Sequence, residues 1–114
     1  MNEEWSGVPG YETKYEVSNH GRIRSVRKNK ILTPDVNRCG YLRLCVWDKG
    51  QRIRFLIHRL VAKVWIANPD NLPEVNHKIP DKKNNHVDNL EWINRVDNMI
   101  HVYQWKSAYN ENPF

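Results

Sequence analysis

A small set of polar side chains in the C-terminal half has the types and the spacing for hydrolytic chemistry. His77 ends the short apolar stretch Glu74-Val75-Asn76-His77, Asn89 opens a second strand-like run, and Asn98 lies in a segment with helical spacing. A neutral imidazole can remove a proton from an attacking water, and amide oxygens together with waters can coordinate a hard cation such as Mg²⁺. Arranged over two strands and a helix, these residues could place a general base and one metal ion beside a phosphodiester.

The residues around this set predict the elements that must position it. Residues 74–77 and 89–93 are expected to form two strands joined by a polar loop over 78–88, and Asn94 is a suitable N-cap for a following helix. The helix is expected to bury one apolar face with i, i+3, i+4, i+7 spacing, formed by Val96, Met99, Ile100 and Tyr103. Asn98 falls on another face, from which it could face His77.

The N-terminal half has the alternation of apolar and polar residues that is typical of strands. A hairpin is expected over residues 15–25, with a turn at 18–21, and further strands are expected at 31–32, 41–47 and 52–57. Helical spacing of apolar residues over 60–65 predicts a helix that ends at Asn68-Pro69. The chain is therefore expected to have an α+β fold with antiparallel strands in its N-terminal part.

The positive charge is concentrated in one part of the chain. The formal net charge is +5, but residues 22–63 hold twelve Lys or Arg and only Asp35 and Asp48 as acids, a local net charge of +10. Such a block indicates a polyanionic partner, although a charge run can also be merely a solvated face. The candidate DNA-contacting residues are Arg22, Arg24, Arg27, Lys28, Lys30, Arg43, Arg52 and Arg54, together with His101 as a phosphate contact.

Composition excludes several classes of protein. The longest unbroken apolar run has only four residues, so neither a transmembrane helix nor a secretory leader is expected, and no membrane partner is predicted. Cys39 and Cys45 do not form a Cys-x-x-Cys pair and, with His58, lack the spacing of a zinc site. They are expected to be free thiols of a cytoplasmic protein, in the host cytoplasm if a phage encodes the chain.

The order and spacing of these motifs resemble the HNH nucleases, and in particular the nicking homing endonucleases of phages and introns. The residues that carry this resemblance are Val75-Asn76-His77, Asn84-Asn85, Asn89-Leu90-Glu91-Trp92 and Asn98-Met99. His58-Arg59-Leu60-Val61-Ala62 looks like the helix that precedes the motif in such enzymes, and residues 5–25 are similar to a nuclease-associated modular segment. The resemblance spans roughly residues 3–101.

The resemblance implies a fold and a role for each site residue. It implies a β-rich DNA-binding segment over 1–57, a helix plus a ββα-metal core over 58–106, and a C-terminal tail over 107–114. His77 would be the general base, Asn89 would brace the loop that carries it, and Asn76 and Asn98 would ligate one divalent metal. That metal would be Mg²⁺, for which Mn²⁺ could substitute.

The same resemblance implies a function. The chain would hydrolyse phosphodiester bonds of double-stranded DNA and leave a 5′-phosphate and a 3′-hydroxyl. One site per chain implies that a monomer nicks one strand, whereas a double-strand break would need a dimer. Longer members of the family carry a C-terminal DNA-reading domain that this chain does not show, so low sequence specificity is expected.

The chain departs from the family pattern at two places. Many HNH enzymes have Asp where this chain has Asn76, and the turn Lys78-Ile79-Pro80-Asp81 replaces a turn that usually contains glycine. Both differences favour the main alternative, a catalytically silent DNA-binding protein that keeps the nuclease fold. A structural or adaptor protein is a third alternative, but it explains neither the basic block nor the spacing of the polar residues.

Overall fold

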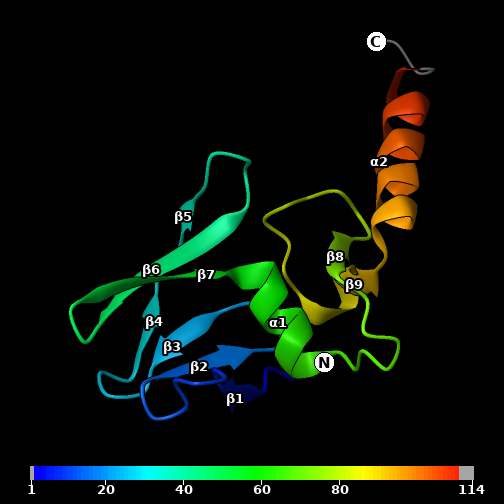
Figure 1. Cartoon of the computed structure of the whole chain (residues 1–114). Helices are drawn as coiled ribbons and strands as arrows, with labels where there is room; N and C mark the ends of the chain where they lie inside the picture. The colour runs from blue at the N-terminus through cyan, green and yellow to red at the C-terminus, as the bar shows by residue number, and fades with distance from the viewer. Residues whose placement is uncertain (1, 111–114) are drawn as a thin grey trace.

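The computed structural model describes residues 2–110, and the side chains of residues 2–104. Three antiparallel sheets surround a short helix, and a longer helix follows the last sheet (Figure 1). The sheets have the strand orders β1-β2-β3-β4, β5-β6-β7 and β8-β9. The elements are β1 (Trp5–Gly7), β2 (Tyr15–Ser18), β3 (Ile23–Ser25), β4 (Lys30–Leu32), β5 (Asp35–Val36), β6 (Leu42–Asp48), β7 (Gln51–Leu56), α1 (Ile57–Trp65), β8 (Glu74–His77), the 3₁₀ turn η1 (Val87–Asn89), β9 (Leu90–Ile93) and α2 (Arg95–Asn110). The architecture confirms the expected α+β class.

The ribbon formed by β6 and β7 has one apolar face and one basic face. Leu44 and Val46 are buried, whereas Arg52 and Arg54 on the opposite face are exposed. Cross-strand partners lie on the same face of a sheet, and the register pairs Cys45 with Arg54 and Trp47 with Arg52. The alternation predicted from the sequence is therefore present.

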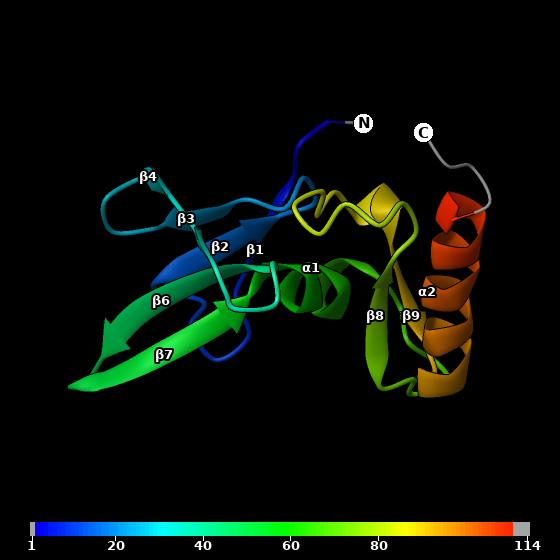
Figure 2. The same cartoon turned by 90° about the horizontal axis from the view of Figure 1, so that it is seen from above.

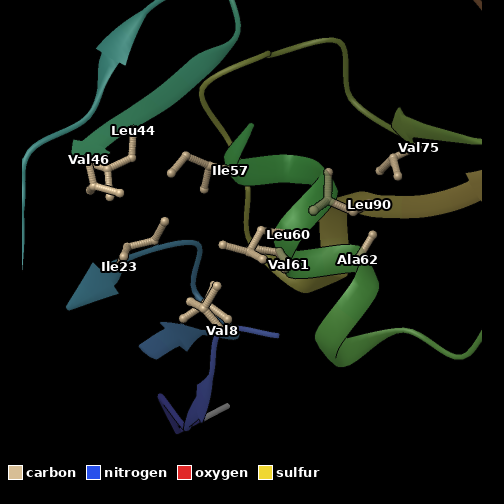
Figure 3. Packing of buried hydrophobic residues seen from close by; sticks show 11 residues of the cluster. Val8, Ile23, Leu44, Val46, Ile57, Leu60, Val61, Ala62, Val75 and Leu90 are labelled. Atoms are coloured by element: carbon tan, nitrogen blue, oxygen red, sulfur yellow. The ribbon is translucent and has the colours of Figure 1, made fainter. Parts of the chain in front are cut away.

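One hydrophobic core joins the N-terminal strands to the C-terminal hairpin. Helix α1 lies at its centre, with Leu60, Val61 and Ala62 buried between the sheets (Figure 3). The buried members of this core are Val8, Val17, Ile23, Leu44, Val46, Ile57, Leu60, Val61, Ala62, Val75 and Leu90. The boundary at 57/58 stays a prediction, but residues on both sides of it contribute to the same core.

The two helices differ from expectation in their bounds. Helix α1 ends at Trp65, earlier than Asn68-Pro69, and the Asn68 amide instead bridges a turn through the backbone N–H and C=O of Leu72 (2.8 and 2.9 Å). Helix α2 runs to Asn110, past the expected end of the core, and residues 111–114 of the expected tail lie outside the described residues. Asn94 caps α2 as expected, since its Oδ1 accepts the backbone N–H of Asp97 at 2.8 Å.

The prediction that α2 buries one apolar face was wrong. The side chains of Val96, Met99, Ile100 and Tyr103 are 66%, 64%, 48% and 74% exposed. The physical reason is that α2 packs mainly beside β8, with Asn98 bonded to β8 and His101 close to the carbonyl oxygen of Lys78, and then extends away from the two larger sheets (Figures 1 and 2). No helix within residues 2–110 combines the length and the apolar character needed to cross a bilayer.

Candidate active site

The β8–β9 hairpin sends its candidate site residues to two different faces. Successive side chains of a strand alternate between faces, so His77 shares a face with Val75, while Asn76 shares the other with Glu74. The register places Glu91 directly opposite Asn76. His77 therefore faces the core and α1, and Asn76 lies on the face next to α2.

His77 lies in a buried polar and aromatic cluster. It is only 6% exposed, and its ring centroid lies 5.1 Å from that of His58 and 5.9 Å from that of Tyr41. Tyr41 also stacks on His58 at 4.7 Å, and Lys82 Nζ lies 4.8 Å from the centre of the Tyr41 ring. Residues from the β5–β6 turn, from α1 and from the loop after β8 thus enclose the imidazole.

Asn85 determines which nitrogen of His77 can act as a base. The Asn85 Oδ1 lies 2.7 Å from His77 Nε2, and an amide oxygen can only accept a hydrogen bond. Nε2 therefore carries the proton, and Nδ1 keeps its lone pair. Burial lowers the pKa of His77 below its usual value, with a smaller opposing effect from the hydrogen bond to Asn85. The ring is consequently neutral near pH 7, which is the state that a general base needs.

The Asn89 side chain ties together the loop that follows His77. Its Oδ1 accepts the backbone N–H of Ile79 at 2.9 Å, and its Nδ2 donates to the carbonyl oxygens of Ile79 and Asn84, both at 3.1 Å. The backbone N–H of Lys78 donates to the carbonyl oxygen of Asn89 at 2.8 Å. Asn89 is 6% exposed and contacts backbone groups, so it supports the loop.

Asn76 and Asn98 lie on the other face of the hairpin, each bound to a carboxylate. Asn76 Nδ2 donates to Glu91 Oε1 at 3.0 Å, and Asn98 Nδ2 donates to Glu74 Oε1 at 2.9 Å. Asn98 is thus directed to the face of β8 opposite the one that carries His77, in contrast to the expectation that it would face His77. Two amide oxygens and two carboxylates form an oxygen-rich donor set, which fits a hard divalent cation.

Two of the four side chains in this candidate donor set are amides. Within the described part of the chain, no group of three or more His, Cys, Asp or Glu side chains is placed to hold a metal. His101 lies beside the same hairpin, since its Nε2 is 3.1 Å from the carbonyl oxygen of Lys78. Helix α2 therefore approaches the end of β8 at the residue directly after His77.

The turn between β2 and β3 supports the loop that holds Asn85. The backbone N–H of Val87 donates to the carbonyl oxygen of Asn19 at 2.9 Å, and the rings of His20 and His86 stack at 4.7 Å. A Cβ on Gly21 would lie 2.7 Å from the backbone oxygen of Asn85. The N-terminal segment thus helps to fix the residue that orients His77.

We expect Gly21→Ala to destabilise the fold by about 2 kcal/mol or more and to reduce activity. Gly21 has φ +88, which costs an L-residue roughly 1–2 kcal/mol, and the clash with the Asn85 backbone adds to this cost. Gly10→Ala is the matched control, because Gly10 has φ +84 and a methyl group added there would meet nothing within 4 Å. Urea unfolding of both variants should show a clearly larger loss for Gly21→Ala; equal losses would contradict the tight contact with Asn85.

His58 should make the stability of the fold depend on pH. Burial is the main cause that lowers the pKa of His58 from 6.5 to about 4, and the neighbouring His77 and Arg59 add to it. The unfolded chain then binds more protons than the folded chain between pH 6.5 and 4. Stability is therefore fully present above pH 6.5 and lost as the pH falls through 4, by roughly 3 kcal/mol.

We expect His58→Phe to remove a large part of that dependence. Phe keeps a flat ring against Tyr41 but does not titrate, and His58 Nδ1 has no hydrogen-bond partner among the described residues, so Phe leaves no broken bond there. Urea unfolding at pH 4.5 and 7.5 measures the difference. An unchanged pH slope in His58→Phe would show that other groups cause it.

The candidate DNA-contacting cations fall into two groups. Three are paired with acids: Arg22 with Glu3, Arg24 with Glu16, and Arg43 with Asp35. The others are exposed, namely Arg27, Lys28, Lys30, Arg52 and Arg54. Of these, Arg52 and Arg54 lie on the basic face of the β6–β7 ribbon, so this face is the best-defined candidate for phosphate contact.

Four residues near the site were given no role in it from the sequence. Asn85, Tyr41, Glu74 and Glu91 contact the candidate base or the candidate metal ligands. The two-residue alternation of β8 and the pairing of β9 could have placed Glu74 and Glu91 on the face of Asn76. His58, which begins the segment that resembles the helix preceding the motif, is buried within the first turn of α1.

The sequence is similar to those of known proteins. The NUMOD4 motif matches residues 3–47. The chain is 40% identical over 100 residues to an uncharacterized HNH endonuclease of Acanthamoeba polyphaga mimivirus, covering 87% of this chain and 30% of the relative. It is 34% identical over 96 residues to the DNA endonuclease I-HmuI of Bacillus phage SP01, covering 84% of this chain and 55% of the relative.

A solved structure has the same fold. It is described as DNA binding and cleavage by the HNH homing endonuclease I-HmuI, and it superposes with a TM-score of 0.77 at 33% identity, covering 96% of this chain and 62% of that chain. The chain thus spans less than two thirds of the length of each of these relatives. Over most of its length the chain is thus similar in sequence and in fold to HNH homing endonucleases, and its residues 3–47 match the NUMOD4 motif.

Proposed function

We propose that this chain is a metal-dependent DNA endonuclease that nicks one strand of a duplex, with His77 as its general base. The observation that carries the proposal is the hydrogen bond between His77 Nε2 and Asn85 Oδ1. It leaves Nδ1 as a proton acceptor on a ring whose pKa is lowered by burial.

The chain's own residues would prepare the attacking water. His77 Nδ1 would take its proton as the oxygen attacks phosphorus. Asn85 would hold the tautomer, and Asn89 would fix the loop that carries both groups. A phosphodiester lying across the end of β8, near Lys78, would meet His77 from one side and Asn76 and Asn98 from the other. The products would be a 5′-phosphate and a 3′-hydroxyl.

Asn76 and Asn98 would hold one divalent cation, Mg²⁺ or Mn²⁺. When bound, this cation would supply Lewis-acid stabilisation of the charge that develops on the phosphate and on the leaving oxygen. Both side chains present amide oxygens, and hard cations accept such ligands together with water and substrate phosphate. The two neighbouring carboxylates make this face electrostatically suitable for a cation.

Double-stranded DNA would lie along the basic face of the β6–β7 ribbon. Contacts from Arg52 and Arg54 would go mainly to phosphates, which position a duplex without reading its sequence. Low sequence specificity is therefore part of the proposal. A monomer with one site would nick, and a double-strand break would need two chains.

We expect Arg52→Ala/Arg54→Ala to weaken duplex binding by about tenfold at low salt. Each lost phosphate contact should also reduce the slope of log K against log salt by about 1. Fluorescence anisotropy with a labelled duplex at several salt concentrations measures both effects. Lys63→Ala, an exposed cation on α1, is the control and should bind like wild type. Equal affinities in both variants would show that the DNA lies elsewhere.

The proposed function is tested by conversion of supercoiled plasmid to open-circle DNA. Wild type and His77→Ala would be incubated with Mg²⁺, with Mn²⁺ and with EDTA. Metal-dependent nicking by wild type that is lost in His77→Ala supports the proposal. A wild type that binds the plasmid but cleaves it with neither metal would refute it in favour of the alternative, a catalytically silent DNA-binding protein with the nuclease fold.

A further inference from the structure

Each candidate metal ligand donates its amide N–H to a carboxylate of its own. Glu91 Oε1 accepts from Asn76 Nδ2 at 3.0 Å, and Glu74 Oε1 accepts from Asn98 Nδ2 at 2.9 Å. Two separate pairs therefore have the same arrangement, although one is a cross-strand pair and the other joins a strand to a helix. This repetition indicates that the two carboxylates have the same role.

The first consequence of these bonds concerns orientation. An amide has a donating nitrogen and an accepting oxygen on the same planar group. When a carboxylate holds the nitrogen, the oxygen must point to the other side of the amide. Glu91 and Glu74 therefore determine where the Oδ1 atoms of Asn76 and Asn98 are presented.

The second consequence concerns charge. Asn76 and Asn98 are neutral, so by themselves they offer a divalent cation only dipoles. Glu74 and Glu91 bring two negative charges to the same face of the hairpin, within hydrogen-bond distance of the ligand side chains. A cation bound to the amide oxygens would be attracted by both charges.

We propose that Glu74 and Glu91 are positioning residues of the metal site, which orient the two asparagine ligands and supply the negative charge that these ligands lack. This inference rests on the proposed function, since it assumes a divalent cation on Asn76 and Asn98. Groups that hydrogen-bond metal ligands typically change metal affinity by about 10–100-fold when they are altered.

The test is Mn²⁺ binding, measured by electron paramagnetic resonance of free Mn²⁺ in the presence of a short duplex, with the duplex alone subtracted. Glu91→Gln and Glu74→Gln keep an acceptor oxygen but remove the charge, and each should weaken Mn²⁺ binding about tenfold. The corresponding alanine variants also lose the orientation and should bind more weakly still. Asp70→Asn is the control. Asp70 is exposed on a loop outside the site, and this substitution removes one negative charge, as each Glu→Gln substitution does.

A charge exchange within one pair makes the test sharper. Asn76→Asp alone places two carboxylates opposite each other, which is destabilising. Asn76→Asp/Glu91→Gln moves the charge across the pair and restores an N–H donor, so Mn²⁺ affinity should return to within a few fold of wild type. A purely structural role would make affinity follow thermal stability, which is measured on the same samples.

The outcomes separate this inference from the function on which it rests. Nicking by wild type together with unchanged Mn²⁺ affinity in all four Glu variants overturns the role of Glu74 and Glu91 and leaves the nuclease intact. A weakening in Asp70→Asn equal to that in the Glu variants overturns it as well, because the effect would then be one of overall charge. A wild type that neither binds Mn²⁺ nor nicks overturns both proposals.

Discussion

His77→Ala is expected to lower the rate of plasmid nicking by about 10³-fold, because removal of a positioned general base typically costs about 10²–10⁴-fold. Duplex binding should remain, since the exposed cations of the β6–β7 ribbon are unchanged. The nicking rate at saturating Mn²⁺ and the duplex affinity by anisotropy give the two numbers. Loss of both together would indicate a folding defect, which circular dichroism and thermal unfolding would reveal.

Chemical rescue distinguishes a base from a packing residue. His77→Ala leaves a cavity beside Tyr41 and His58, so added imidazole has a site of suitable shape. Partial recovery of nicking that increases with the concentration of neutral imidazole would identify proton transfer as the lost step. If nicking in His77→Ala stays near the wild-type rate without imidazole, then His77 is not the base.

Asn89→Ala is expected to destabilise the fold by about 3 kcal/mol and to slow nicking well below the unfolding temperature. The substitution removes three hydrogen bonds to the backbone of the loop after His77, and a buried polar group left without a partner costs about 1–3 kcal/mol. Urea unfolding gives the stability, and single-turnover nicking at low temperature gives the activity of the folded fraction.

Asn68→Ala is the matched control for this experiment. Asn68 also bridges a turn through two backbone hydrogen bonds, but its turn follows α1 and lies outside the candidate site. It should lower stability while the folded fraction nicks at the wild-type rate. Equal effects of the two variants on nicking would mean that Asn89 stabilises the fold without any specific influence on His77.

The fold was predicted mainly from segments in which apolar residues recur with a regular period. Alternation in 41–47 and 52–57 predicted a ribbon with one apolar and one basic face, which the structure places at 42–48 and 51–56. The order of His77, Asn89 and Asn98 predicted the hairpin and the following helix. Which site residues lie close together depends on the face of the strand to which each side chain projects. Asn76 and His77 are adjacent in sequence but project to opposite faces of β8, which adjacency alone conceals.

Long-range contacts explain what the sequence did not reveal. Tyr41 and His58 reach His77 only because the β5–β6 turn and α1 fold over β8, and no local pattern contains that contact. The apolar spacing in α2 predicted a buried face, but burial requires an opposing surface. Among the described residues α2 packs mainly beside β8, so Val96, Met99 and Tyr103 remain exposed.

The contact between Gly21 and Asn85 bears on how such a protein could change through recombination. The NUMOD4 motif over residues 3–47 includes Gly21, whereas Asn85 lies in the nuclease hairpin region. A recombination point between these two parts would combine the β2–β3 turn of one parent with the Asn85 loop of another. A residue with a Cβ in place of Gly21 would then displace Asn85, the hydrogen-bond partner of His77. The two parts are therefore expected to be inherited together, and chimeras should tolerate exchange of the distant β6–β7 turn far better than exchange at the β2–β3 turn.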